Sequence, residues 1–397
     1  MIPMRKKSTP SSNKWLTLLF ACLLLSCTVC NAATTETLKP DTITLSLTEA
    51  GTLHERIGNN KKLKIECLRL KGMLNIDDIQ FIREMAGCYY DTKGHKYDGH
   101  LRYLDISGAT LTNTDNKEVS IYPRDPSEYE GTPWPSAEAY INDKGTPVAI
   151  FAYLYDMEEI VLPAKLKSIG DDAFIFCRSL KSINIPESVQ KIGLRAFFGC
   201  SSLKSMKLPI GITEIKSGLL SSCTNLTSID IPYTTEEIGH NAFSKCTSLK
   251  SIELPYSLNN MGISVFYGCT ALTSVTIPKN IRYINDYTFY GCNSLKSIYA
   301  LNPQGIGIKG KPFEEYTQSQ CTLYVPEGSM YNYQCWEEWY AFNHIVEFSP
   351  TGINGVHSAA ERREVERYDT SGRRQTSPTK GLNIVRFNDG TTRKVMK

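Results

Sequence analysis

Six cysteines recur every 23 residues and are the first candidates for chemistry: Cys177, Cys200, Cys223, Cys246, Cys269 and Cys292. A metal ion needs ligands that converge on one point, whereas equivalent positions of a repeat form a line. A nucleophile needs a basic neighbour and partial exposure, but these cysteines lie between phenylalanine and leucine positions. Disulfides between successive turns are the alternative, although stacked parallel side chains point the same way. We therefore expect buried thiols that pack in the core.

The loop from Cys88 to His100, with the sequence CYYDTKGHKYDGH, is a second candidate metal site. Its ligands would be Asp91, His95, Asp98 and His100. Polar, turn-rich loops of this kind are more often plain surface. The chain contains no G-x-S-x-G, no H-E-x-x-H, no phosphate-binding loop and no dinucleotide fingerprint. The sequence thus predicts a non-enzymatic protein without metal or cofactor, and a metal-dependent enzyme using the Asp91–His100 loop is the weaker alternative.

The elements that position these cysteines can be read from one unit, CRSLKSINIPESVQKIGLRAFFGC. Ile183 and Ile185 alternate with polar residues, which predicts a strand with both side chains on its inward face. Pro186 ends the strand because it has no amide proton for the ladder. Gly193 allows the next turn, and LRAFFGC fits one short helical turn. Stacked units would bury a continuous core that no single unit could bury.

The repeated pattern I-G-x-x-A-F-x-x-C-x-x-L-x-x-I-x-I-P resembles the BspA-like class of leucine-rich repeats found in bacterial surface proteins. The resemblance covers about 148–300 and implies a β-rich leucine-rich-repeat solenoid, right-handed, of 23-residue repeats. The pattern departs at 216–220 (KSGLL), where Lys216 replaces glycine and Leu219-Leu220 replace Ala-Phe, and again at Val265 and Thr288. We expect one altered corner in the third turn.

The N-terminus, residues 1–33, is expected to be a signal peptide. Basic residues precede the apolar run Trp15–Cys27, which is too short for a membrane-spanning helix. Two cleavage interpretations are open. Leu24–Cys27 resembles a bacterial lipobox, in which Cys27 would be lipidated, whereas Cys30–Ala33 suits an ordinary signal peptidase. In both cases the chain is exported, and only the lipobox interpretation gives it a lipid anchor through which to contact a membrane.

The segments that flank the repeats are expected to cap the solenoid, because its end turns would otherwise expose the core. Residues 34–147 form an N-terminal cap region of diverged turns, with a strand and helix at Leu63–Gly87, a strand at Leu101–Leu111 and a surface loop at 116–147. Residues 301–350 form the C-terminal cap. The aromatic residues expected to cover the last turn are Tyr333, Trp336, Trp339 and Phe342. Within an oxidising compartment, the disulfide candidates are Cys67–Cys88 and Cys321–Cys335.

The tail, residues 351–397, has short alternating strands broken by Ser-Gly, Lys-Gly and Asp-Gly turns. YDTSGRR followed by GLNIVR and a basic end resembles the C-terminal sorting domains of cargo for the type IX secretion route. This resemblance implies a small β domain that the export machinery recognises. A minor β-hairpin appendage is the alternative.

The non-core positions of the strands are the candidate binding surface, because they vary on a regular scaffold. We call this surface the strand face and predict for it Lys181, Asn184, Lys204, Lys207, Asp230, Lys250, Glu253, Thr276, Lys296 and Tyr299. Neutral sequence drift on a solvent-exposed face without a binding role would give the same variation.

The expected function is binding of a macromolecular partner outside the cytosol. The body of the chain, 34–350, is mildly acidic and gives no electrostatic reason to expect nucleic-acid binding. The family resemblance implies adhesion to host matrix or serum proteins, to other cells or to glycans, by a protein that is secreted or held at the outer membrane or cell surface. A structural component of the envelope without a diffusible ligand is the alternative.

Overall fold

The repeating part of the chain folds into stacked turns, each of which contributes two short strands to two parallel ladders. The computed structural model describes residues 41–87, 99–112, 119–121, 137–141, 147–349, 364–368, 374–375, 382–387 and 392–396. The long ladder contains β7 (Glu159–Val161), β9 (Ser182–Asn184), β11 (Ser205–Lys207), β13 (Ser228–Asp230), β15 (Ser251–Ile252), β17 (Ser274–Ile277) and β19 (Ser297–Ala300). The short ladder contains β8 (Ser168–Ile169), β10 (Lys191–Ile192), β12 (Glu214–Ile215), β14 (Glu237–Ile238), β16 (Asn260–Met261), β18 (Tyr283–Ile284) and β20 (Gly307–Ile308).

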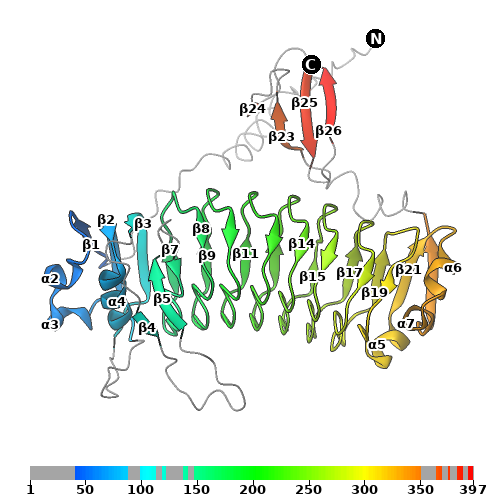
Figure 1. Ribbon diagram of the computed structural model, residues 1–397, viewed down its shortest axis with the longest axis horizontal. Coiled ribbons are helices and arrows are strands. Elements are labelled where there is room, and N and C mark those ends of the chain that lie inside the picture. The colour runs from blue at the N-terminus through cyan, green and yellow to red at the C-terminus, as the bar shows by residue number, and fades with distance from the viewer. Residues whose placement is uncertain are drawn as a thin grey trace, which may run out of the picture. The chain divides into compact units, whose positions relative to one another are not determined.

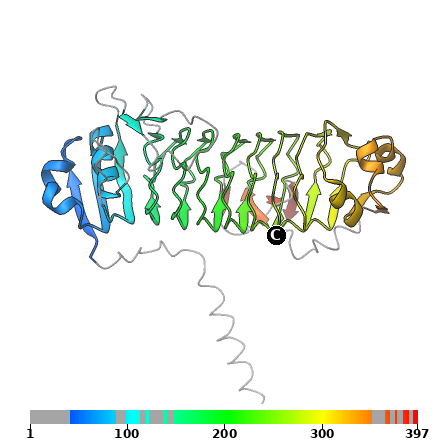
Figure 2. The same cartoon turned by 90° about the horizontal axis from the view of Figure 1, so that it is seen from below.

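The register of these ladders follows the sequence repeat. Ser205 pairs with Ser228 and Glu214 with Glu237, so that equivalent residues of successive turns lie side by side. Figures 1 and 2 show the turns in chain order, one beside the next. The fold is the expected β-rich solenoid, and residues 23 apart in sequence become neighbours in space.

The core consists of columns of identical apolar side chains. Phe151, Phe174 and Phe197 stack with ring centroids 5.4 and 5.1 Å apart. A second stack, with centroids 5.5–5.6 Å apart, contains Phe243, Phe266, Phe289 and Phe313. Leu220 separates the two stacks and is also fully buried.

The segments that precede the cysteines are turns rather than the helical turn expected from LRAFFGC. We call each of these segments a corner; the first one spans 170–176. Two residues of that corner, Asp172 and Phe176, have φ values of 54° and 56°, in the left-handed region, and a helix cannot continue through such residues. Hydrogen bonds to the next turn hold them there, since Asp172 N donates to Leu194 O and Phe176 N to Phe198 O.

Gly193 serves close packing rather than a left-handed turn. A Cβ at this position would lie 2.4 Å from the backbone nitrogen of Asp171 in the previous turn. A side chain would therefore push adjacent turns apart.

The N-terminal cap continues the long ladder with parallel strands in the sheet order β1-β2-β3-β7-β9. Its elements are β1 (Ile43–Leu47), α2 (Leu53–Ile57), α3 (Asn59–Lys62), β2 (Cys67–Leu74), α4 (Ile76–Met85) and β3 (Tyr103–Leu111). Asn75 caps α4, since its side chain accepts hydrogen bonds from the backbone nitrogens of Asp77 and Asp78. The buried Arg83 of α4 donates to Ile150 O and Ala152 O, which ties the cap to the first turn.

The segment 116–147 contains strands where the sequence analysis expected a surface loop. Three strands pair in the order β4-β5-β6 and are antiparallel: β4 (Val119–Ile121), β5 (Ala137–Ile141) and β6 (Pro147–Val148). The many Asp, Pro and Gly residues of this segment concealed two short stretches that can pair.

The C-terminal cap consists of α5 (Glu315–Gln320), β21 (Thr322–Pro326), α6 (Met330–Gln334), α7 (Glu337–Tyr340) and β22 (His344–Phe348). Trp339, Tyr333 and Phe342 are buried as predicted, and Trp339 Nε1 donates to Ile306 O at 2.6 Å. Trp336 is an exception, because 38% of its surface is exposed. Its ring edge lies against Gly307 of β20, so it still covers part of the last turn.

The tail contains an antiparallel sheet with the strand order β24-β23-β25-β26. The strands are β23 (Glu364–Tyr368), β24 (Arg374–Gln375), β25 (Leu382–Phe387) and β26 (Thr392–Met396). The prediction of short β-strands in this part is confirmed.

Candidate functional site

The strand face lies on the outside of the long ladder, as predicted. Eight of its ten residues are exposed, and Thr276 and Tyr299 are half-buried. Backbone hydrogen bonds between turns fix their positions, for example from Thr227 N to Lys204 O and from Lys296 N to Thr273 O. The side chains therefore form rows on a rigid support.

The electrostatics of the strand face are dominated by lysines. Lys181 pairs with Glu158, and Lys207 pairs with Glu187 at 2.9 Å. The hydrogen bond between Lys207 and Glu187 raises the pKa of the lysine and lowers that of the carboxyl group. Such exposed pairs stabilise the fold little.

Three further lysines of the strand face are unpaired. Within the described residues, Lys204, Lys250 and Lys296 form no ion pair, and all three are exposed. These ammonium groups are available to an acidic partner.

The C-terminal end of the strand face is aromatic. Tyr299 stacks on Tyr324 with ring centroids 4.5 Å apart, and Phe348 meets Tyr299 edge-on at 6.1 Å. Tyr299 could be predicted from the repeat, whereas Tyr324 and Phe348 could not, because these two belong to the cap. The strand face thus combines rows of lysines with an aromatic end, and aromatic residues are enriched in protein interfaces.

The cysteine column is buried, which confirms the expectation of core thiols. All six side chains are fully buried. Each Sγ donates to a backbone carbonyl 26 residues earlier, as in Cys200 to Phe174 O at 3.2 Å. That oxygen also accepts from Cys177 N, so both of its lone pairs are used. Cysteine therefore supplies a small apolar volume together with a weak donor, which explains its place in every turn.

Burial also makes these thiols unreactive. It raises the pKa of Cys200, Cys246 and Cys292 well above the usual value and that of Cys269 to about 12. Nucleophilic chemistry requires the thiolate, and the thiol form dominates here at neutral pH.

Native protein is expected to resist alkylation at the repeat cysteines. Iodoacetamide at about pH 8 should modify the exposed Cys335 and leave Cys200 to Cys292 unmodified until urea unfolds the chain. Peptide mass spectrometry of native and unfolded samples measures this. Rapid labelling of Cys246 in the native protein would contradict the structure.

The predicted Cys321–Cys335 disulfide is not present. Cys321 is a buried thiol at the start of β21, whereas Cys335 is an exposed thiol at the end of α6 that donates to Tyr331 O. One side chain is therefore in the core and the other is in contact with solvent. Cys27, Cys88 and the candidate ligands Asp91, His95 and Asp98 lie outside the described residues; His100 is exposed and contacts Leu63 O at 2.9 Å through Nδ1.

The part of the chain that the structure describes offers neither a metal-ligand cluster nor a membrane-spanning helix. No three His, Cys, Asp or Glu side chains in those residues lie close enough to hold a metal ion. None of the helices described is long and apolar enough to cross a bilayer.

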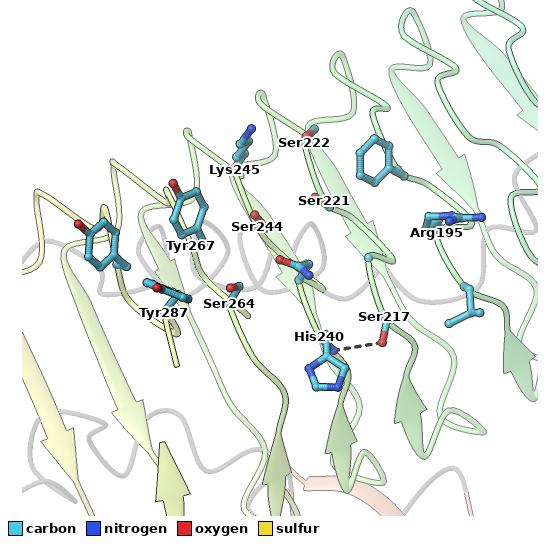
Figure 3. Close-up of a pocket in the computed structure, with 15 residues that line it drawn as sticks. Arg195, Ser217, Ser221, Ser222, His240, Ser244, Lys245, Ser264, Tyr267 and Tyr287 are labelled. Carbon is cyan, nitrogen blue, oxygen red and sulfur yellow. Dashed lines mark hydrogen bonds between the residues drawn. The ribbon is translucent and has the colours of Figure 1, made fainter. Parts of the chain in front are cut away.

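A groove of about 810 Å³ crosses the corners of five successive turns and was not identified from the sequence. Figure 3 shows serines along it, with Arg195 on one side and Tyr267 and Tyr287 on the other. None of the ten strand-face residues lines it. The sequence did contain a signal, because within the departure at 216–220 the groove-lining Ser217 and Gly218 stand where the previous turn has Leu194 and Arg195.

The family match of the repeat region agrees with this fold. Residues 147–262 and 213–328 match the BspA type leucine rich repeat region, in six copies. No curated protein matches the chain. The chain is similar to a leucine rich repeat protein from T. pallidum, with 32% identity over 40% of this chain and 76% of that one, and a TM-score of 0.38.

Two further solved structures are similar over part of their length. A leucine-rich repeat protein from Bacteroides ovatus is 28% identical over 51% of this chain and 63% of that one, with a TM-score of 0.33. A leucine rich cell surface protein from Faecalibacterium prausnitzii is 18% identical over 65% and 82%, with a TM-score of 0.28. The family match assigns the repeat region to the BspA type of leucine-rich repeats.

Proposed function

We propose that this chain is a non-enzymatic, exported surface protein that binds a macromolecular partner through the strand face. The observation that carries the proposal is the row of exposed side chains on a backbone fixed by hydrogen bonds between turns. Such preorganisation lowers the entropy cost of binding. Leucine-rich repeats of this type resemble those of bacterial surface proteins, which supports the same role.

The chemistry of the strand face favours an acidic protein surface as the partner. Lys204, Lys250 and Lys296 are exposed cations, and the stacked Tyr299 and Tyr324 offer apolar area at one end. Charged rims steer association, and aromatic residues supply much of the binding energy in protein interfaces. The partner would lie along several turns.

Charge reversal on the strand face is expected to abolish partner binding. The triple variant Lys204→Glu, Lys250→Glu and Lys296→Glu should weaken binding at least about 100-fold, because each reversal replaces an attraction by a repulsion. Surface plasmon resonance against a panel of extracellular-matrix and serum proteins measures this, together with the salt dependence.

A matched control makes the same change in net charge at positions outside the strand face. Lys165, Lys191 and Lys279 are exposed lysines elsewhere on the turns, and their reversal to glutamate should preserve binding to within about threefold. Equal losses in both triple variants would mean that only net charge matters and would refute the face assignment.

Export and anchoring are proposed from the two ends of the chain. The antiparallel sheet of β23 to β26 supports a small β tail, and recognition of that tail by the export machinery is the proposed role. Mass spectrometry of the mature protein from the native cell distinguishes lipid on Cys27, cleavage near Ala33 and removal of residues 351–397. A mature chain that retains both ends unchanged would refute both processing proposals.

A further inference from the structure

The groove on the corners exists because one column of side chains changes size along the solenoid. The column lies two residues before each cysteine and contains Ile175, Phe198, Ser221, Ser244, Tyr267 and Tyr290. Ser221 and Ser244 occupy two consecutive turns between larger neighbours, and both line the groove. We call this set the corner column. Its two serines leave a depression that is two turns wide.

The walls of the groove are aromatic. Tyr267 stacks on Tyr290 with centroids 6.1 Å apart, and Tyr287 meets Tyr290 edge-on at 5.5 Å. Phe198 lines the opposite wall. Tyr267 and Tyr287 are 36% and 42% exposed, so that parts of their rings remain open to a ligand.

The floor of the groove contains hydroxyl groups without partners. Ser221 and Ser244 are each only 5% exposed, and within the described residues neither hydroxyl forms a hydrogen bond. Neither Oγ is among the buried polar atoms that lack a partner, so each hydroxyl is accessible from the groove, where water or a ligand can pair with it. Both side chains line the groove, so a ligand there could satisfy them.

The backbone of the floor cannot pair with a peptide strand. Ser222 N donates to Ser244 O at 2.7 Å and Gly199 N to Ser221 O at 2.8 Å, so these groups are already used between turns. Recognition of a peptide by strand addition requires free backbone donors and acceptors. Side-chain hydroxyls and aromatic rings are what the groove offers instead.

The charge of the groove is positive. Lys245 lines it, is exposed and forms no ion pair within the described residues. His240 accepts a hydrogen bond from Ile263 N through Nδ1 at 2.8 Å, which leaves Nε2 to donate. Asp172 pairs with Arg195 at 2.8 Å. No carboxylate belongs to the groove lining in the part of the chain described.

We propose that this groove binds a saccharide chain that contains a carboxylated sugar. Sugar rings present C–H faces that pack on tyrosine rings, and their hydroxyls can pair with Ser221 and Ser244. The carboxylate pairs with Lys245. A volume of about 810 Å³ is within the usual range for a ligand site. The site is separate from the strand face, so it does not depend on the proposed function.

The test is calorimetry of the full-length protein with defined oligosaccharides. The probes are a galacturonic acid hexamer, a sialylated trisaccharide and a neutral glucose hexamer. Binding of an acidic probe at least about 10-fold tighter than the neutral one is expected. The two acidic probes distinguish a uronic acid from a sialic acid as the source of the carboxylate. Equal affinity for neutral and acidic probes, or binding of none of them, overturns the proposal.

Variants locate the binding in the groove. Ser221→Phe with Ser244→Tyr fills it with side chains that the corner column already carries in the adjacent turns, so the turns should still stack. We expect at least a 20-fold loss of acidic oligosaccharide binding for this double variant, by steric exclusion. Thr270→Tyr, at an exposed position outside the groove lining, is the size control and should bind normally. Unchanged binding by the double variant overturns the proposal.

A variant of the exposed Lys245 provides a second test in case the double variant that fills the groove does not fold. Lys245→Gln should weaken the acidic probe about 10-fold, and Lys279→Gln should not. An effect of equal size in the two lysine variants overturns the assignment of the carboxylate to Lys245. Binding of a poly-glutamate peptide in place of every saccharide would also overturn the proposal, by showing that a peptide is the ligand.

Discussion

A rise from about pH 9 to about pH 10 is expected to lower the free energy of unfolding by about 5 kcal/mol. The cause is the column of buried thiols. Burial raises the pKa of Cys200, Cys223, Cys246, Cys269 and Cys292 above the usual value of 9.0. The folded chain therefore keeps these protons while the unfolded chain releases them.

The sign of this effect follows from proton binding. Above about pH 9 the unfolded state binds fewer protons than the folded state, so stability falls as the pH rises. Each thiol contributes about 1 kcal/mol over this unit of pH, and five contribute about 5 kcal/mol. The stabilisation is fully present below the unfolded pKa and is lost progressively up to the folded pKa, which for Cys269 is about 12.

Urea unfolding at about pH 8, 9 and 10 with a reductant measures the effect. Cys246→Ala is the informative variant, because it removes one titrating group from the middle of the column. Its loss of stability between pH 9 and 10 should be smaller by about 1 kcal/mol than that of the parent chain. Identical pH dependence in the two proteins would show that thiol burial does not govern alkaline unfolding.

The ladders could be predicted from sequence because their signal is local and repeated. Ile183 and Ile185 fix an inward face at period 2, and the repeat of 23 residues sets the register between turns. The corners could not be assigned in the same way. Asp172 and Phe176 adopt left-handed φ values, and hydrogen bonds to Leu194 and Phe198 in the next turn hold them there. Asp tolerates this region, but Phe does not favour it, so the pair could not be predicted from local preference alone.

The groove was harder to predict from the sequence than the corners were. The departure from the repeat pattern at 216–220 can be seen in the sequence. Ser244, however, belongs to a corner that follows the pattern, so nothing in that corner alone indicates a groove. Its importance comes from lying beside Ser221 and before Tyr267 in the stacked column. A depression is a property of side-chain volumes in successive turns, so it becomes visible only when residues 23 apart are compared at one position.

Replacing Phe266 by alanine is expected to destabilise the protein by about 3–5 kcal/mol. Phe266 is fully buried, and its ring stacks on Phe243 and Phe289 with centroids 5.6 and 5.5 Å away. The substitution leaves a cavity in the middle of the column and removes two aromatic contacts. Urea or thermal unfolding measures the change.

Two variants test whether the column position explains the loss. Tyr267→Ala alters the next residue, which is 36% exposed and outside the core, and should cost less than about 1 kcal/mol. Phe266→Leu should cost no more than about 1.5 kcal/mol, because the turn that ends at Cys223 already places Leu220 in this column. If Phe266→Ala lowers the free energy of unfolding by no more than Tyr267→Ala does, the phenylalanine stack is not important for stability.

The position of Phe266 also determines how far the damage extends. In a solenoid each turn contacts only its neighbours, so stability is a sum of turn and interface contributions. Removing Phe266 weakens two interfaces at once, whereas Phe313 stacks on Phe289 and then meets the aromatic cap through Trp339 and Phe342. Phe266→Ala should therefore increase hydrogen exchange in the turns on both sides of Cys269, including the corners that form the groove, and leave the N-terminal cap protected.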